Sequence, residues 1–590
     1  MAGRQWHVAV TAAAAAAAIV MGALRGPVRA EQGREPAAPS IERRIDGIFE
    51  RWTRPGMPGC AVGVARFGQV LYTRGYGLAN LEYGVPIKPD TIFESGSVAK
   101  QFTAAAVALL AIDGKLSRQD AVRKYVPELP EFGVPITIQH LLNHTSGLRS
   151  QWPMLTLAGR PPGLAVHTVP EILELVSGYR ELNFKPGDEF LYNNTAFTLL
   201  GVVVQRVSGK SLDAFTQERL FRPLGMGRTA WREDFSKVVR DRATAYRAAA
   251  GGEFRTNMSF TNVIGNGGLL TTVGDLLKWN ANLDRPNVGG QAMVDELQRR
   301  GRLNDNSQID YAQGLYVTEY RGVREVSHGG STAGYQTFLG RWPDERLSVA
   351  ILCNTTGTSP EAYAHQVVDL LLDGRLAQRA AVKTIAVPAG TLDALAGTYR
   401  EPATDAVMRV SPGADGKTLR MGGQIVAPSA VGVLSNADGS RTFTASVPGT
   451  TPEAWPAAGS SPRVVERAPN AKPRTWQWQA PFSPSVGELQ AYAGDYSCDE
   501  LGVTYTFYVD GPQLRLRFRP AQRVALVPAY LDAFEGDGNV YRFTRDAGGA
   551  VTGLQIYAGR VRHLGFVRLR PPDSRHPPTP ENRPATFMSP

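Results

Sequence analysis

A serine and a lysine stand three residues apart in the stretch ESGSVAKQFTAAAVALL, residues 94–110. The apolar run after Lys100 predicts a helix, and the spacing places Ser97 and Lys100 on one face of it. A lysine in the first turn of a helix opposes the helix dipole. That dipole and burial both lower the pKa of an ammonium group, and a neutral amine can then take the proton of a serine hydroxyl. The pair therefore indicates nucleophilic catalysis, with an N-cap role for Ser97 as the structural alternative.

Two further stretches carry polar side chains at positions suited to chemistry. KPGDEFLYNNTAFTLLG, residues 185–201, presents Tyr192 and Asn194 between a Pro-Gly turn and an apolar helix. VSHGGSTAGYQTFLG, residues 326–340, presents His328 on a strand, followed by two glycines and a serine. Taken singly, Tyr192 fits a half-buried loop tyrosine and His328 a hydrogen-bonded strand histidine. Together with the Ser-x-x-Lys pair, Tyr192 and His328 indicate that the three motifs form one active site.

In this order, Ser-x-x-Lys, Tyr-x-Asn and His-x-Gly, the chain resembles the penicillin-recognising serine hydrolases. These include class C beta-lactamases, DD-peptidases, D-aminopeptidases and family VIII carboxylesterases. The resemblance covers about residues 40–375 and extends to the stretches HLLNHTSGL, GKSLDAFTQERLFRPLGMGRTAW and GNGGLLTTVGDLLKW. It implies an α/β (α+β) serine beta-lactamase-like domain, in which an antiparallel sheet is flanked by helices and carries a helical insertion.

The resemblance also implies a role for each motif residue. Ser97 is the expected nucleophile, which forms an acyl-enzyme, and Lys100 holds or accepts its proton. Tyr192 is expected to shuttle the proton during acylation and deacylation. Asn194 is expected to hydrogen-bond the substrate or Lys100. The backbone N–H groups of Ser97 and Ser331 are expected to form the oxyanion hole.

The third motif bears on the substrate. His328, Gly329 and Gly330 are expected to border the bound substrate, with the glycines allowing a close approach of the strand. Many beta-lactamases carry Lys-Thr-Gly here, and a histidine that is neutral near pH 7 offers less fixed positive charge to a beta-lactam carboxylate. The sequence therefore favours a peptidase acting on small or D-residue-containing peptides, with carboxylesterase or beta-lactamase as alternatives. A catalytically idle protein that binds envelope peptides is the non-enzyme alternative.

Hydrophobic periodicity predicts the elements that must hold these residues. Residues 40–54 have a helical pattern, and the following stretch has the pattern of a strand, a Phe-Gly-Gln turn and a second strand. Helical patterns dominate residues 97–300, strand patterns return at 314–354, and a helix closes the region. We expect one sheet assembled from both ends of residues 40–375, with the helical insertion between them.

A change of composition after residue 385 predicts further domains. LDALAGTYR at 392–400 recurs as LQAYAGDYS at 489–497, which indicates two copies of one antiparallel β unit. These units resemble the lipocalin-like barrels of some D-aminopeptidase-like proteins, and either shape access to the site or act as spacers. The predicted order is a catalytic domain over residues 31–384, β units over 385–447 and 486–570 with a linker over 448–485 between them, and a disordered tail over 571–590.

The first 30 residues have the features of a secretory signal peptide. A basic start is followed by an apolar run and by the small-x-small sequence that ends at Ala30. We therefore expect a periplasmic or secreted protein without stable membrane insertion after cleavage; an uncleaved anchor is the alternative. The net charge of +10 is scattered, with no Lys/Arg run, so no nucleic-acid partner is predicted. The oligomeric state stays open.

No metal or cofactor is predicted. The chain has no His-Glu-x-x-His motif and no Gly-x-Ser-x-Gly motif, and its 8 histidines are dispersed. We interpret His140 and His144 as structural residues near a helix end and a turn. The 3 cysteines are too few for a disulfide framework, although Cys60 and Cys353 can pair if their strands are neighbours.

Overall fold

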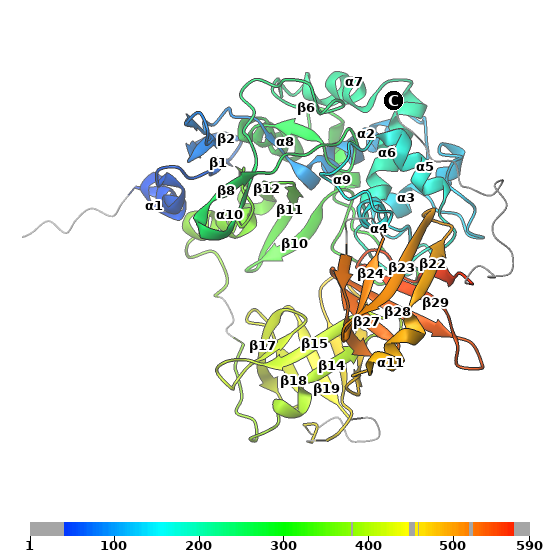
Figure 1. Ribbon diagram of the computed structural model, residues 1–590. Helices are drawn as coiled ribbons and strands as arrows, with labels where there is room; N and C mark the ends of the chain where they lie inside the picture. The colour runs from blue at the N-terminus through cyan, green and yellow to red at the C-terminus, as the bar shows by residue number, and fades with distance from the viewer. Residues whose placement is uncertain (1–39, 379–381, 448–454, 458, 519–522, 571–590) are drawn as a thin grey trace, which may run out of the picture.

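The computed structural model describes residues 40–378, 382–447, 455–457, 459–518 and 523–570. The predicted signal peptide and C-terminal tail lie outside these residues. Figure 1 shows an N-terminal domain at the top, a first β unit below it in yellow, and a second β unit in orange and red beside the helices of the N-terminal domain. The predicted α/β class with appended β units is confirmed.

The N-terminal domain is built on a 6-stranded antiparallel sheet. Its strands, in spatial order, are β10 (Tyr316–Tyr320), β11 (Val323–Thr332), β12 (Tyr335–Trp342), β13 (Leu347–Cys353), β1 (Cys60–Arg66) and β2 (Gln69–Tyr76). The sheet is therefore assembled from both ends of the domain, as predicted. The turn between β1 and β2 has Phe67 and Gly68 at φ of 53° and 80°, a left-handed conformation that glycine adopts without strain.

Helices cover both faces of this sheet. One face packs against α1 (Ile41–Ile48) and α10 (Pro360–Leu371) through a buried cluster that includes Val62, Ile351 and Val367. The other face presents small residues, among them Ala61 and Ala350, to α8 (Val273–Asp284). The predicted N-terminal helix ends early, at Ile48, and continues as a short 3-10 turn over Glu50–Thr53.

The helical insertion lies between the two halves of the sheet. Its helices are α2 (Lys100–Ile112), α3 (Ile138–Leu142), α4 (Gln151–Leu157), α5 (Val169–Ser177), α6 (Asn194–Ser208), α7 (Leu212–Thr216), α8 and α9 (Gly290–Leu297). Residues 102–110 of α2 are buried on every side, as an all-apolar helix requires. Because α2 packs against α6, the Ser-x-x-Lys and Tyr-x-Asn motifs lie at the ends of two contacting helices.

A disulfide joins Cys60 to Cys353. These cysteines begin β1 and end β13, and the two strands place them directly opposite one another. The pairing that the sequence left open is therefore present, and it ties the first strand of the sheet to the last one.

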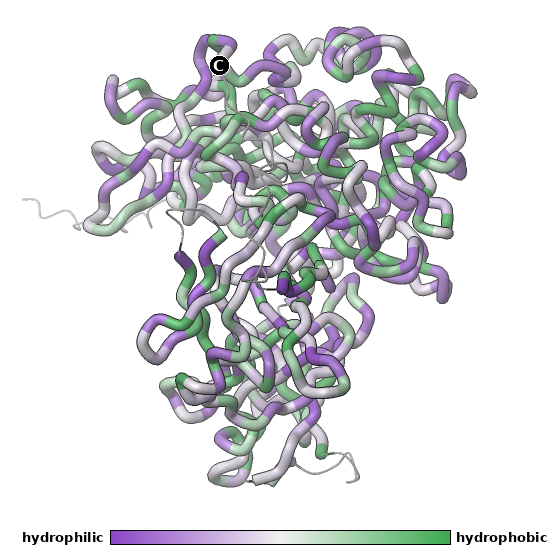
Figure 2. Tube along the Cα trace, turned by 45° about the vertical axis from the view of Figure 1, so that its right-hand side comes forward, coloured by the Kyte–Doolittle hydropathy of each residue, from purple (hydrophilic) through white to green (hydrophobic). Residues whose placement is uncertain are grey.

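The first β unit is a closed barrel. Its strands are β14 (Gly397–Arg400), β15 (Val407–Pro412), β16 (Leu419–Met421), β17 (Gln424–Ala430), β18 (Val433–Ser435), β19 (Thr442–Ser446), β20 (Arg463–Arg467) and β21 (Arg474–Gln479). The predicted linker over 448–485 is wrong at this point, because β20 and β21 lie within it and close the barrel onto β14. Val464 and Trp476 from these strands are buried in the barrel core. Hydrophilic and hydrophobic stretches alternate along the chain in this lower part of the molecule (Figure 2).

The second β unit is a 9-stranded sheet, whose two edge strands are not paired with each other among the described residues. Its order is β25 (Arg523–Ala525), β24 (Gln513–Arg517), β23 (Val503–Asp510), β22 (Gly494–Cys498), β30 (Leu564–Arg568), β29 (Val551–Tyr557), β28 (Asn539–Arg545), β27 (Ala533–Gly536) and β26 (Val527–Tyr530). A short helix, α11 (Val486–Leu489), precedes β22.

The repeated sequence motif has the same structure in both β units. Gly397 and Gly494 begin β14 and β22 with φ of 140° and 142°, a conformation that favours glycine. The tyrosine two residues later is fully buried in each unit, and its hydroxyl donates a 2.9 Å hydrogen bond to the carbonyl four residues before it. The two units therefore share one structural start, as the repeat predicts.

The second β unit packs directly on the helical insertion. Arg149 is buried and forms an ion pair with Glu500, and the Tyr505 hydroxyl donates to the carbonyl of Leu157 at 2.6 Å. Apolar residues of both parts form one continuous core. No helix in the described ranges combines the length and the hydropathy needed to cross a membrane.

Candidate active site

Ser97 is presented to solvent by a tight turn at the start of helix α2. It lies in a 3-10 turn, Gly96–Ala99, that runs directly into the helix. Ser97 is the one residue of 91–110 that is not buried. Gly96 has φ of 53°, and a Cβ atom there would lie 2.7 Å from the backbone nitrogen of Ser331. A glycine is therefore required before Ser97, and the Ser97 hydroxyl does not cap the helix as the structural alternative proposed.

Lys100 is fully buried behind Ser97. Its Nζ lies 3.1 Å from Ser97 Oγ, 2.9 Å from Asn194 Oδ1 and 2.5 Å from the carbonyl oxygen of Asn266. Burial, followed by the positive charge of Arg560, lowers the pKa of Lys100 well below the ordinary lysine value of 10.5.

The neutral form of Lys100 satisfies this geometry. A neutral amine has two N–H donors and one lone pair, and Asn194 Oδ1 and the Asn266 carbonyl are acceptors that take the two donors. The lone pair then faces Ser97 Oγ and accepts its proton. The structure thus brings Ser97, Lys100 and Asn194 together in the arrangement that the motifs predict.

Tyr192 lies beside this pair, immediately before α6. The Lys100 Nζ atom is 4.9 Å from the centroid of the Tyr192 ring, and the His144 ring packs on the ring at 4.3 Å. Burial raises the pKa of Tyr192, and the neighbouring Ser97 hydroxyl opposes part of that shift. The Tyr192 hydroxyl has no close hydrogen-bond partner among the described residues. The raised pKa keeps Tyr192 a protonated phenol, and its buried hydroxyl lies beside Ser97.

Strand β11 forms the opposite wall of the site. Gly330 packs on the segment before Ser97, and a Cβ atom at this position would overlap the carbonyl oxygen of Ser95 and the Thr337 hydroxyl. Gly329, by contrast, is exposed toward the cleft, and the nearest atom to an added Cβ is 3.9 Å away. Gly330 therefore has a packing role against Ser95 that the sequence did not predict. Both glycines line the larger cleft, and their substrate role stays a prediction. The oxyanion role of the Ser97 and Ser331 N–H groups stays a prediction, although Ser331 abuts Gly96.

His328 is occupied within the protein. Its Nδ1 lies 2.5 Å from the Gly329 carbonyl, so Nδ1 carries the proton, and its Nε2 accepts from the Tyr311 hydroxyl at 3.1 Å. Burial, followed by the charge of Lys100, lowers the pKa of His328 to about 3. The ring is therefore neutral at physiological pH, as expected, but it orients Tyr311 and has no free nitrogen for a substrate.

Three residues of the site were not predicted from the sequence. Asn266 belongs to GNGGLLTT, which marked the family but gave no role to the asparagine. Tyr311 belongs to none of the sequence motifs. Arg560 comes from the loop between β29 and β30 of the second β unit, and its Cζ lies 4.8 Å from the Tyr192 ring centroid. The site therefore has the fixed positive charge that His328 does not supply, which corrects the prediction of a weakly charged site.

His140 and His144 are structural, in agreement with the prediction. His140 contributes to the cap of α3 through Thr137, and His144 accepts a hydrogen bond from the backbone N–H of Asn193 at 3.1 Å. Burial lowers the pKa of His144 well below 6.5, so it packs on Tyr192 as a neutral ring.

Ser97 lies between two hollows of the surface. A smaller one, about 340 Å³, is lined by Trp152, Met258 and Phe260 on the side of the helical insertion. A larger cleft, about 760 Å³, is lined by Tyr192, His328 and Arg560. Such a position allows the two parts of a cleavable substrate to extend to opposite sides of the nucleophile.

One group of side chains at the far end of the larger cleft has the composition of a metal site. Ligand atoms of Glu325, Glu361 and His365 lie within 4.8 Å of one another. His365 Nε2 is 2.8 Å from Glu325, and Ser327 donates to the same carboxylate at 2.7 Å, so hydrogen bonds already account for Glu325, the buried member of the group. The absence of a metal cofactor stays a prediction.

The packing of Gly330 gives a test with a matched control. Gly330→Ala forces a methyl group against Ser95 and Thr337, and we expect it to lower the free energy of unfolding by about 1–3 kcal/mol, as overpacking does. Gly329→Ala adds the same methyl group to open space, and its effect should stay within about 0.5 kcal/mol. Chemical denaturation of both variants measures the difference. Equal stabilities would contradict the close approach of β11 to the Ser97 segment.

The fold and the Ser97–Lys100 pair define a serine hydrolase with a beta-lactamase-like domain. Residues 45–373 match the Beta-lactamase family, and the chain belongs to this family. It is 27% identical over 547 residues to a D-aminopeptidase of Gluconobacter oxydans, covering 90% of this chain and 98% of the relative. It is 31% identical over 329 residues to penicillin-binding protein 4* of Bacillus subtilis, covering 53% of this chain and 71% of the relative.

A solved structure supports the fold. The octameric penicillin-binding protein homologue from Pyrococcus abyssi superposes with a TM-score of 0.51 at 22% identity. The match covers 82% of this chain and 99% of that structure. The predicted family and enzyme class are confirmed by these similarities.

Proposed function

We propose that the protein is an exported peptidase that hydrolyses short peptides or amides containing D-residues through an acyl-enzyme on Ser97. The observation that carries the chemistry is the buried Lys100 amine at 3.1 Å from Ser97 Oγ, with its other two contacts made to acceptors. The similarity to a D-aminopeptidase extends over almost the whole length of both chains, the β units included, and this supports the substrate class.

The site residues account for each proton in the proposed reaction. Lys100 takes the Ser97 proton as Oγ bonds to the scissile carbonyl carbon, and the N–H groups of Ser97 and Ser331 stabilise the oxyanion. The protonated Lys100 returns this proton through the Tyr192 hydroxyl to the leaving nitrogen as the C–N bond breaks. Water then attacks the ester carbonyl carbon, and its proton passes through Tyr192 to Lys100. Lys100 returns this proton to Ser97 Oγ as the ester C–O bond breaks and the acid leaves.

Export is part of the proposal. It is supported by the signal-peptide features of residues 1–30 and by the Cys60–Cys353 disulfide, a bond that persists in oxidising compartments. The proposed location is the periplasm or the medium.

A comparison of three substrates, followed by mass spectrometry, tests the proposed activity. We expect D-alanine p-nitroanilide to give a higher kcat/KM than a short-chain nitrophenyl ester or a chromogenic cephalosporin, with L-alanine p-nitroanilide as the stereochemical control. A preference for the ester or the cephalosporin would replace the proposal with the corresponding alternative. An inert protein that gains no covalent adduct on Ser97 from an activated acyl compound would be a binding protein.

A further inference from the structure

A loop of the second β unit reaches the catalytic cleft of the N-terminal domain. The loop joins β29 to β30, and Arg560 at its tip lines the larger cleft together with Ser97, Tyr192 and His328. Its guanidinium carbon lies 4.8 Å from the centroid of the Tyr192 ring, and the Lys100 Nζ lies 4.9 Å from the same centroid. The guanidinium is therefore close to the reacting groups.

The backbone of this loop is fixed to the helical insertion. Asn183 donates to the carbonyl of Arg560 at 3.0 Å and accepts from the N–H of Arg562 at 2.8 Å. The buried Arg149 donates to the carbonyl of Arg562 at 3.2 Å. A loop held from both sides presents its central side chain in one place, which is what specific recognition requires.

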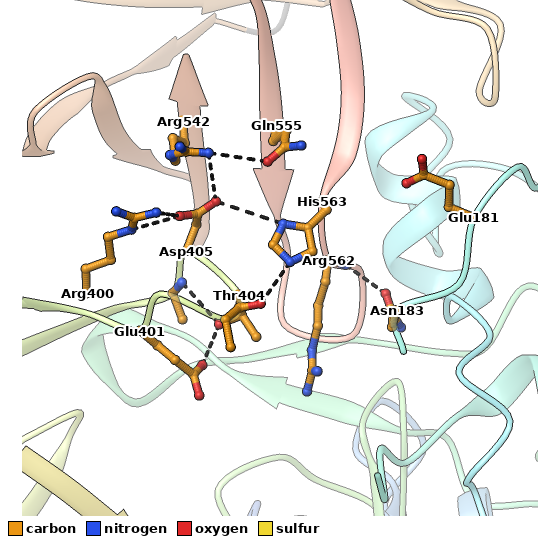
Figure 3. A network of polar contacts seen from close by, with 12 residues as sticks. Glu181, Asn183, Arg400, Glu401, Thr404, Asp405, Arg542, Gln555, Arg562 and His563 are labelled. Atoms are coloured by element: carbon orange, nitrogen blue, oxygen red, sulfur yellow. Dashed lines mark hydrogen bonds and ion pairs between the residues drawn. The ribbon is translucent and has the colours of Figure 1, made fainter. Parts of the chain in front are cut away.

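The first β unit supports the same loop. Figure 3 shows His563 between the second β unit and the first, where its Nε2 donates to the carbonyl of Ala403 at 2.9 Å. In the same network, the Asp405 carboxylate of the first unit accepts a hydrogen bond from Arg542 of the second unit at 3.3 Å. All three parts of the molecule thus meet at the loop that carries Arg560.

The Arg560 guanidinium contacts the Tyr192 ring but forms no ion pair and no side-chain hydrogen bond within the described residues. Its neighbours in the same unit differ: Arg562 pairs with Glu189 at 2.9 Å, and Arg545 pairs with Asp532 at 2.7 Å. An arginine is charged at any physiological pH and presents five donors in a planar fork. In this cleft that fork faces the space that a substrate fills.

We propose that Arg560 binds a carboxylate of the substrate, in the part of the substrate that occupies the cleft with Tyr192 and His328. A guanidinium matches a carboxylate in charge and in bidentate geometry. Since a residue spans about 3.5 Å, a carboxylate one or two residues beyond the scissile bond lies within reach. The inference rests on the proposed attack by Ser97 and narrows the substrate class to acidic peptides, either through a free C-terminus or through an acidic side chain.

Three substrates distinguish the two sources of the carboxylate. D-alanyl-D-alanine has a free C-terminus, D-alanyl-D-alanine amide has no carboxylate, and D-alanyl-D-isoglutamine carries one only on its side chain. We expect the wild type to prefer one of the two acids over the amide by about 10- to 100-fold in kcat/KM, as charge-assisted hydrogen bonds contribute. The preferred acid identifies the source. Equal rates on all three would overturn the proposal.

Variants of Arg560 assign that preference to the side chain. Arg560→Met should reduce the preference to less than about threefold, and Arg560→Lys should retain part of it, because lysine keeps the charge and loses the fork. Arg562→Met, on the same loop but paired with Glu189, is the matched control and should keep the full preference. Rates are compared at the pH plateau of each variant, since Arg560 also influences Lys100. An unchanged preference in Arg560→Met would overturn the assignment.

A binding measurement separates this inference from the proposed activity. Titration calorimetry of the Ser97→Ala variant with each of the two acids needs no turnover. Adding Arg560→Met to that variant should weaken binding by about 10-fold or more. If the wild type cleaves none of the three substrates but binding still depends on Arg560, the peptidase proposal fails and the carboxylate site stands. If the wild type cleaves the substrates and binding does not depend on Arg560, the carboxylate site fails and the peptidase proposal stands.

Discussion

Replacing Ser97 with alanine should lower kcat for every hydrolysed substrate by about 10⁴-fold or more, the scale found when a hydrolase loses its nucleophile. The Ser97 hydroxyl is the one that faces the Lys100 amine, and no other serine side chain contacts that amine in the described part of the chain. KM should change little, because the substrate pockets on both sides keep their walls. Steady-state kinetics on the D-alanine anilide, with the variant purified to exclude wild-type contamination, measure the loss.

A neighbouring serine provides the control. The Ser95 hydroxyl is buried only two residues away and has no hydrogen-bond partner among the described side and main chains. Ser95→Ala should therefore keep kcat within about threefold, since a change away from the reacting groups is normally small. A Ser97→Ala variant that retained a tenth of the activity would assign the nucleophile to another group.

Removing the titratable amine should have an effect of similar size. Lys100→Arg keeps a cation at the site but cannot supply a neutral base, because the guanidinium does not lose its proton in proteins. We expect a loss of about 10³-fold or more in kcat/KM, within the range of a missing general base combined with a misplaced nucleophile. Lys100→Met, which removes both charge and amine, should be equally inactive. Activity in either variant near the wild-type level would exclude Lys100 as the base.

The pH profile tests the same residue in the wild type. The neutral amine accumulates as the pH rises through the lowered pKa of Lys100, so kcat/KM rises with pH and levels off well below 10.5. Arg560 is a nearby cation that disfavours the charged amine, so Arg560→Met should raise the pKa of Lys100 and move the rising limb to higher pH on a substrate without a carboxylate. A limb that stays in place would mean that another group titrates.

The reacting groups could be predicted because each motif is local. Ser97 and Lys100 share one turn, and the Tyr-x-Asn motif directly precedes a helix that the apolar pattern marks, so the sequence holds their geometry within a few residues. His328 was placed correctly on its strand, but its role depends on Tyr311, which contacts it from another segment and has no pattern of its own. The role of Arg560 is the hardest to predict from the sequence, because its place in the cleft depends on how a separate β unit packs on the N-terminal domain.

The fold shows the same limit. Alternation and turns predicted the central sheet and the start of both β units, because Gly397 and Gly494 head the same buried-tyrosine motif. The linker prediction over 448–485 is wrong because proline, alanine and serine dominate the composition of this segment and obscure its two short alternating stretches. Strands β20 and β21 are defined mainly by their pairing with β19 and β14. Barrel closure depends on these long-range pairings, which the local composition does not predict.

The pairing of β1 with β13 sets an order for the folding of the chain. The cysteines of these strands are 293 residues apart, so the N-terminal hairpin has no neighbour until almost the whole domain has been made. At 5–20 residues per second, that wait is about 15–60 s of synthesis. During it, the edge of β1 that later pairs with β13 is an open sheet edge, which is prone to pairing with other chains. The domain therefore depends on protection of its nascent N-terminal hairpin, and the disulfide can lock the sheet only after its last strand has joined.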